Sequence, residues 1–413
     1  MRGLRSLCLV LALALVALSA RAAEPIKVGF SMALTGGTAA IGKQILLTLQ
    51  LWRDQINAKG GLLGRPVALV YYDDQTDPSV VPGIYAKLIN VDKVDLLIGP
   101  YATNMTTAAL PIIMQYHKTT IGLLANAANS HFHYPNYFSM IPSGPEPKLS
   151  FSTGYFTLAA AQTPRPKTVA IVGADAEYGR NATDGARENA PKFGFDVVYD
   201  KSYPPTTADY TPIVRAIQAA HPDLVYVASY PPDSVGMIHA ANEVGLEAKM
   251  FGGAMVGLQI TATAMQLGPL LNGVVNNAAV NVSEMMKNPQ AAAILDEYQK
   301  RAPALGIDPL GYTFVPYTIS ACAILTEAVT QTQSLDQEKI ADYIRSHEFH
   351  TASGDIKFGA DGEWSKSNVL FGQFQHVTGN GLDQFRGWPI QPIVWPDDAK
   401  TGNLIYPYTA ARK

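Results

Sequence analysis

Cysteine is nearly absent from this sequence, with Cys8 and Cys322 the only two among 413 residues. Cys8 lies in an amino-terminal segment that we expect to be removed, so the mature chain has one thiol and no intrachain disulfide. Cys322 stands among small and apolar residues, which predicts a buried core thiol rather than a nucleophile. No Cys-x-x-Cys pair occurs, and none of the eight histidines has the spacing of a metal-binding motif. We therefore expect neither a metal nor a cofactor.

Charge is scarce as well as cysteine. Charged residues make up 16% of the chain, against about 25% in typical proteins, and 31 basic side chains nearly balance 34 acidic ones. Neither sign dominates, which argues against nucleic acid or a membrane surface as a partner. The chain is long enough for two lobes, each with its own core.

The first 22 residues have the pattern of a secretory signal peptide. Arg2 and Arg5 precede an apolar run from Leu7 to Leu18, and small residues at Ala20 and Ala22 follow it. The run is shorter than the ~20 residues that a membrane-spanning helix needs. We expect cleavage after Ala22 and release into the bacterial periplasm.

Short apolar segments alternate with helical patterns along the mature chain. Leu49, Trp52 and Ile56, for example, recur at three and four residues, the stripe of an amphipathic helix. Such alternation predicts an α/β fold with parallel strands and crossover helices, and the proline-rich segment 142–147 divides it into two lobes. The tail at 388–396 has too many prolines for a central strand. The predicted strands are 26–30, 67–72, 96–98, 121–124, 168–172, 195–198, 224–227 and 250–251, and the predicted later helices are 289–301, 317–332 and 336–345.

Polar turns follow several of these strands. In open α/β sheets, ligands bind beyond the carboxyl ends of the strands, so the turns at 99–107 and 125–130 are candidate ligand contacts. Thr103 is placed there to hydrogen-bond a carboxylate, although a plain helix-capping role is the alternative. In the second series, Tyr178 and Tyr230 follow strands and offer flat walls with hydroxyl groups, unless they serve only packing.

Enzyme motifs are incomplete. Residues 37–44 nearly form a phosphate-binding loop, but Gln44 replaces the hydroxyl that holds the metal. No Gly-x-Ser-x-Gly motif occurs. The acidic pair Asp73 and Asp74 is expected to cap and solvate a turn rather than to transfer protons. We therefore expect no enzymatic activity.

Several longer strings resemble the Leu/Ile/Val-binding proteins of ABC importers. They include residues 26–29, 54–64 and 72–78, and the similarity continues through 98–100, 177–179, 209–211 and 243–246. The resemblance implies a type I periplasmic binding protein, with two Rossmann-like lobes that have parallel-rich central sheets and are joined by three crossovers. Lobe 1 would comprise 23–143 and 277–368, and lobe 2 would comprise 144–276 and 369–413. Such lobes close on a ligand and present a changed surface to a membrane permease.

The same resemblance implies a ligand site with two departures from the family. Ile41 stands where a tyrosine is common, and Ala254 stands where amino-acid binders place the acid that pairs with the ligand ammonium. An ammonium buried without a counter-charge is costly. The implied ligand-binding residues are Tyr101, Ala102, Thr103, Ala127, Asn129, Tyr178, Tyr230, Ala254 and Ile41.

Together these features favour a periplasmic binding protein for a hydrophobic or aromatic carboxylic acid that lacks an α-amino group. A branched-chain or other hydrophobic amino acid is the first alternative. Amides, urea-like solutes or a sensor role follow, and a hydrolase or nucleotide enzyme comes last. The expected partners are a small-molecule ligand and an ABC permease of the inner membrane.

Overall fold

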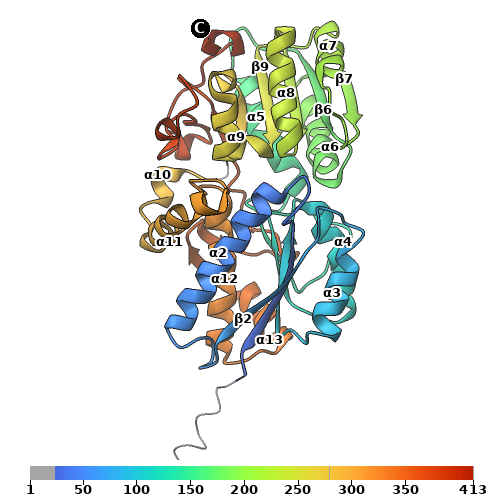
Figure 1. The fold of residues 1–413 in the computed structure, drawn as a ribbon. Helices are drawn as coiled ribbons and strands as arrows, with labels where there is room; N and C mark the ends of the chain where they lie inside the picture. Colours follow the sequence, from blue (N-terminus) through green and yellow to red (C-terminus); the bar gives the residue numbers. More distant parts are fainter. Residues whose placement is uncertain (1–23, 279, 413) are drawn as a thin grey trace, which may run out of the picture.

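A computed structural model describes residues 24–278 and 280–412 of the chain, so the expected signal peptide lies outside the described residues. Two α/β lobes are stacked, with the amino-terminal one at the bottom of Figure 1. The lower lobe has a fully parallel sheet in the order β2-β1-β3-β4-β5. Its strands are β1 (Ile26–Met32), β2 (Val67–Asp73), β3 (Leu96–Tyr101), β4 (Thr120–Leu123) and β5 (Tyr137–Met140).

Helices from two distant parts of the sequence pack in the lower lobe. The local ones are α2 (Ala39–Ala58), α3 (Val81–Asn90) and α4 (Thr103–Gln115). The later ones, α11 (Pro289–Arg301), α12 (Phe314–Thr332) and α13 (Gln337–Ser346), return to it, and α12 packs along α2. Cys322 is fully buried in α12, as predicted, and burial raises the pKa of its thiol.

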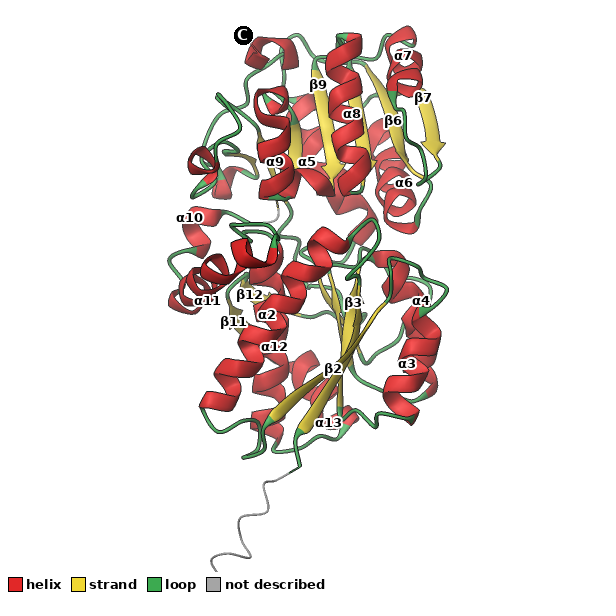
Figure 2. Cartoon of the chain, viewed as in Figure 1, coloured by secondary structure: helices red, strands yellow, loops and turns green. Residues whose placement is uncertain are grey.

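The upper lobe has a mixed sheet in the order β14-β13-β10-β9-β8-β6-β7. Figure 2 labels β6, β7 and β9 of this sheet. The strands from β7 to β10 are parallel, whereas β13 and β14 are antiparallel additions. The proline-rich tail supplies β14 at the sheet edge, which confirms that it is no central strand. The strands are β6 (Thr168–Ala174), β7 (Asp196–Tyr203), β8 (Leu224–Ser229), β9 (Met250–Met255), β10 (Val275–Ala278), β13 (Leu370–Gln373) and β14 (Ile393–Trp395); the α-helices are α5 (Pro147–Ala160), α6 (Glu177–Lys192), α7 (Thr211–Ala219), α8 (Pro231–Val244) and α9 (Thr261–Leu267).

The chain passes between the lobes near three points that lie close together. After β5, Pro142 accepts a hydrogen bond from the Asn368 N–H at 2.8 Å, which joins two passages. Gly144 has a φ of +73°, and a Cβ there would lie 2.5 Å from Ser367 N, so this turn requires glycine. The expected lobe boundary at 276/277 falls inside β10, whose Asn277 pairs with Phe371 of β13. The short α10 (Val282–Met285) and the hairpin of β11 (Glu348–Thr351) and β12 (Gly354–Lys357) complete the elements between these passages.

The acidic pair after β2 divides into two environments. Asp73 accepts hydrogen bonds from the N–H groups of Leu34 and Gln75, which confirms its predicted turn-capping role. Asp74 is fully buried and accepts a bond from the Ser31 hydroxyl, so the prediction that it is solvated was wrong. Burial raises the pKa of Asp74 to about 6, because the charged form loses hydration.

Among the described residues, no helix combines the length and apolar character needed to cross a membrane.

Candidate functional site

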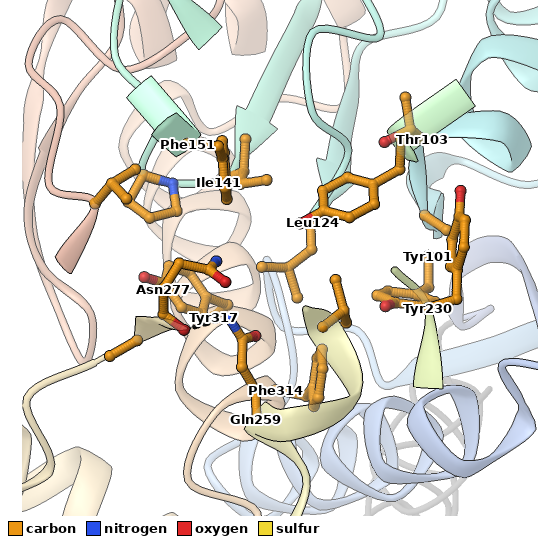
Figure 3. Close-up of a pocket in the computed structure, with 16 residues that line it drawn as sticks. Tyr101, Thr103, Leu124, Ile141, Phe151, Tyr230, Gln259, Asn277, Phe314 and Tyr317 are labelled. Carbon is orange, nitrogen blue, oxygen red and sulfur yellow. Dashed lines mark hydrogen bonds between the residues drawn. The ribbon is translucent and has the colours of Figure 1, made fainter. Parts of the chain in front are cut away.

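A cavity lies where the two lobes meet, beyond the carboxyl ends of strands from both sheets (Figure 3). Its volume is about 50 Å³ in this arrangement of the lobes. Among the described residues that line it, none is Asp, Glu, Lys, Arg or His. A charged ligand group would therefore make its direct contacts with neutral hydrogen-bond donors and helix dipoles.

Thr103 forms one end of this cavity, at the first position of α4. The preceding Ala102 has a φ of +82°, so the chain turns sharply between β3 and the helix. The Thr103 oxygen accepts a hydrogen bond from the Asn126 N–H at 3.0 Å, which leaves the hydroxyl hydrogen available as a donor. The first-turn amides of α4 add the positive end of a helix dipole. This end of the cavity suits a carboxylate.

Aromatic side chains from both lobes form the walls. Tyr101 meets Phe314 edge to face at 5.8 Å between ring centroids, and Tyr178 meets Tyr230 in the same way at 5.7 Å. The Tyr178 hydroxyl donates to the Ala254 carbonyl at 3.1 Å. Burial raises the pKa values of Tyr101, Tyr178 and Tyr230 above that of free tyrosine, so these hydroxyls remain protonated. The walls suit a flat or branched apolar group.

The two lobes also bond directly across the cleft. Asn181 of α6 donates through its side-chain N–H to the Asn126 carbonyl at 3.0 Å, and both residues are buried. The Thr107 hydroxyl approaches the Glu177 carboxylate at 3.4 Å. These bonds link the two lobes directly.

Five of the nine residues expected from the sequence line the cavity: Tyr101, Ala102, Thr103, Tyr178 and Tyr230. The other four lie elsewhere. Asn129 uses its side chain for structural bonds: it donates to the carbonyls of Tyr134 and the distant Asp361, and it accepts from the Tyr134 N–H. Ala127, in the same loop, is buried with a positive φ and is not part of the lining.

Ile41 and Ala254 are core residues. Ile41 is fully buried on α2 within the lower-lobe core, and Ala254 is fully buried on β9 within the upper-lobe core. The cavity wall after β9 comes instead from Val256, at the start of a 3-10 turn. Val256, rather than Ala254, is therefore the position at which to look for an acid that pairs with a ligand ammonium. Like Ala254, Val256 is apolar.

The remaining lining residues were not predicted from the sequence. Leu124 could have been found, because it is the last residue of a predicted strand in the first lobe. Phe314 and Tyr317 carry no local motif, and they reach the cavity only because α12 returns to the lower lobe. The unpredicted lining residues are Leu124, Ile141, Pro142, Phe151, Val256, Gln259, Asn277, Ala278, Phe314, Tyr317 and Val369.

A buried acid lies beside two of the inter-lobe passages. Glu363 is 3% exposed and accepts a hydrogen bond from the Ser143 hydroxyl at 3.3 Å. Loss of hydration, with the nearby Asp361 charge, raises the pKa of Glu363 from 4.5 to about 8. The folded chain thus retains a proton that the unfolded chain releases above about pH 4.5.

We expect this acid to make stability fall as pH rises. Each pKa unit corresponds to about 1.4 kcal/mol, so the free energy of unfolding should decrease by a few kcal/mol between about pH 4.5 and 8. Asp74 and Asp233 have pKa values of about 6, so their contribution to the loss of stability falls mainly below pH 6. Glu363→Gln should remove the decline between pH 6 and 8, as measured by denaturant unfolding. Parallel pH profiles for the two proteins would contradict the assignment.

Comparisons with known proteins agree with this architecture. A family model described as periplasmic binding protein matches residues 25–376. The chain is also similar to the leucine-, isoleucine-, valine-, threonine- and alanine-binding protein of Pseudomonas aeruginosa. The two are 24% identical over 345 residues, which cover 83% of this chain and 88% of that protein.

Two solved structures share the fold while holding different ligands. One is an ABC-transporter solute-binding protein from Rhodopseudomonas palustris BisB5 in complex with 3,4-dihydroxybenzoic acid, with a TM-score of 0.71, 19% identity, and coverage of 86% of this chain and 94% of that one. The other is a branched-chain amino acid transporter substrate-binding protein from Streptococcus pneumoniae in complex with isoleucine, with a TM-score of 0.72, 17% identity, and coverage of 90% and 100%. These matches confirm the expected two-lobed α/β fold.

Proposed function

This chain belongs to the periplasmic binding protein family, and we propose that it binds a small apolar or aromatic carboxylic acid without an α-amino group for an ABC importer. The family and its relatives bind solutes for transport, which supports a transport role rather than catalysis. The observation that carries the ligand class is the cavity lining, which has a carboxylate-compatible end at Thr103 and, within the described part of the chain, no charged side chain.

A hydrophobic amino acid is the second candidate, because the Pseudomonas aeruginosa relative is named for such ligands. Burying its ammonium group in this cavity would leave a cation without a counter-charge in the lining, which raises the free energy of the complex by roughly several kcal/mol. A carboxylic acid with an apolar body has no ammonium group, so the aromatic, neutral lining imposes no such cost on its binding. The solved structures show that this fold accommodates either class.

The importer role completes the proposal. Residues 1–22 would direct export, the mature chain would act in the periplasm, and closure of the lobes would signal ligand occupancy to a permease. The hydrogen bond between Asn181 and Asn126 supports such closure, because it links the two lobes directly.

A thermal-shift screen of the purified mature chain tests the ligand class. Apolar and aromatic carboxylic acids are expected to raise the melting temperature, because a ligand at 100 times its dissociation constant stabilises the folded state by ~2.7 kcal/mol. The amino acids with the same side chains, tested at the same concentration, serve as matched controls and should shift it less. A shift with amino acids alone would favour the second candidate.

A further inference from the structure

The cavity has a polar group at the end remote from Thr103. Figure 3 shows Asn277 and Gln259 on the opposite side of the cavity from Thr103. Asn277 lies on β10, the upper-lobe strand that pairs with β13 through Asn277 and Phe371. It is thus fixed by the paired strands where the chain passes between the lobes.

The side chain of Asn277 is buried with an unused acceptor. The residue is 5% exposed, it lines the cavity, and its side-chain oxygen has no hydrogen-bond partner among the described residues. The neighbouring Asn276 differs in this respect, because its side chain accepts a hydrogen bond from the Met255 N–H and donates one to the Met255 carbonyl. The Asn277 backbone is held as well, because its carbonyl accepts from the Gln259 side chain at 3.1 Å. A rigidly placed, buried and unpaired acceptor is unfavourable unless something else supplies a donor.

A ligand can supply that donor. The side-chain oxygen of asparagine accepts hydrogen bonds, so it matches a hydroxyl or another neutral N–H or O–H group. An ammonium is disfavoured because none of the described residues that line the cavity is an acid. The aromatic residues between the two ends, including Phe151 and Phe314, suit a planar spacer.

We propose that Asn277 is a specificity-determining residue that accepts a hydrogen bond from a hydroxyl group at the end of the ligand remote from its carboxylate. The preferred ligand is then a hydroxylated aromatic acid rather than a purely hydrocarbon one. This inference rests on the proposed function, because it requires the carboxylate to lie at Thr103. An acid without the hydroxyl would leave the Asn277 oxygen unpaired, and sites of this kind reject such analogues.

The test compares four acids of similar shape by calorimetric titration. Benzoate and 4-fluorobenzoate carry no donor at the remote position, whereas 4-hydroxybenzoate and 4-aminobenzoate do. We expect the unaltered protein to bind the two donor-bearing acids at least about 10-fold more tightly than the other two. In Asn277→Leu, which has nearly the same shape, this preference should disappear while benzoate still binds.

Asn277→Asp is the matched control, because it has the same shape and retains an acceptor oxygen. It should keep the preference for 4-hydroxybenzoate over 4-fluorobenzoate even if all affinities fall, and it remains informative should the leucine variant fail to fold. Equal affinities for the four acids in the unaltered protein would overturn this inference but leave the proposed function standing. Loss of the preference in Asn277→Asp would have the same consequence. Failure of these acids and of 4-methylpentanoate to bind would overturn both.

Discussion

Thr103→Val is expected to weaken binding of the carboxylic acid by about 1.5 to 3 kcal/mol, the range for a hydrogen bond to a charged group. The Thr103 hydroxyl already accepts from the Asn126 N–H at 3.0 Å, so its hydrogen is directed to whatever acceptor lies in the cavity. Valine preserves the shape but removes this donor. Calorimetric titration of the acid into both proteins measures the loss.

Thr103→Ser is the matched control, because it keeps the hydroxyl and removes only a methyl group. It should retain most of the affinity that Thr103→Val loses. Since valine also removes the acceptor of the Asn126 N–H, the melting temperature of each ligand-free variant must be compared first. Equal affinities for the unaltered and valine proteins, both folded, would show that the carboxylate lies elsewhere.

Much of the fold was predictable because strand and helix patterns are local. The helix predicted at 289–301 occurs as α11 with the same bounds. Six of the eight predicted strands recur with the same start and a later end, whereas the strand predicted at 121–124 occurs at 120–123 and the one predicted at 195–198 occurs at 196–203. The sequence did not reveal β13, since Leu370–Gln373 is short and becomes a strand only by pairing with β10. That pairing joins segments about a hundred residues apart, which no local pattern records.

The candidate site was predictable only where it follows strands. Thr103, Tyr178 and Tyr230 lie at the amino-terminal ends of the helices that follow β3, β6 and β8, and all three line the cavity. Ala254 does not line this cavity, and the sequence does not show where β9 ends. The strand continues to Met255, so the chain first reaches the cavity at Val256. Asn277 and Phe314 come from an inter-lobe strand and a returning helix, and their positions depend on how the whole chain folds.

The charge of the cavity decides between the two ligand classes, and Val256→Asp is expected to reverse the preference. In the unaltered protein, 4-methylpentanoate should bind more tightly than leucine by about 100-fold or more, because the leucine ammonium would be buried without a partner at a cost of several kcal/mol. An aspartate at Val256, where the upper lobe meets the cavity, supplies that partner. It also places a second carboxylate near a ligand that has only negative charge.

Val256→Asn separates charge from shape, because it has the same size as the aspartate variant and no charge. Leucine should gain affinity in Val256→Asp but not in Val256→Asn, whereas 4-methylpentanoate should lose more in the aspartate variant. Ala254→Asp would not serve, since Ala254 is fully buried in the upper-lobe core and an acid there would destabilise the fold. Tight leucine binding by the unaltered protein, with 4-methylpentanoate unbound, would mean that another residue supplies the counter-charge for the ammonium and that the chain is an amino-acid-binding protein.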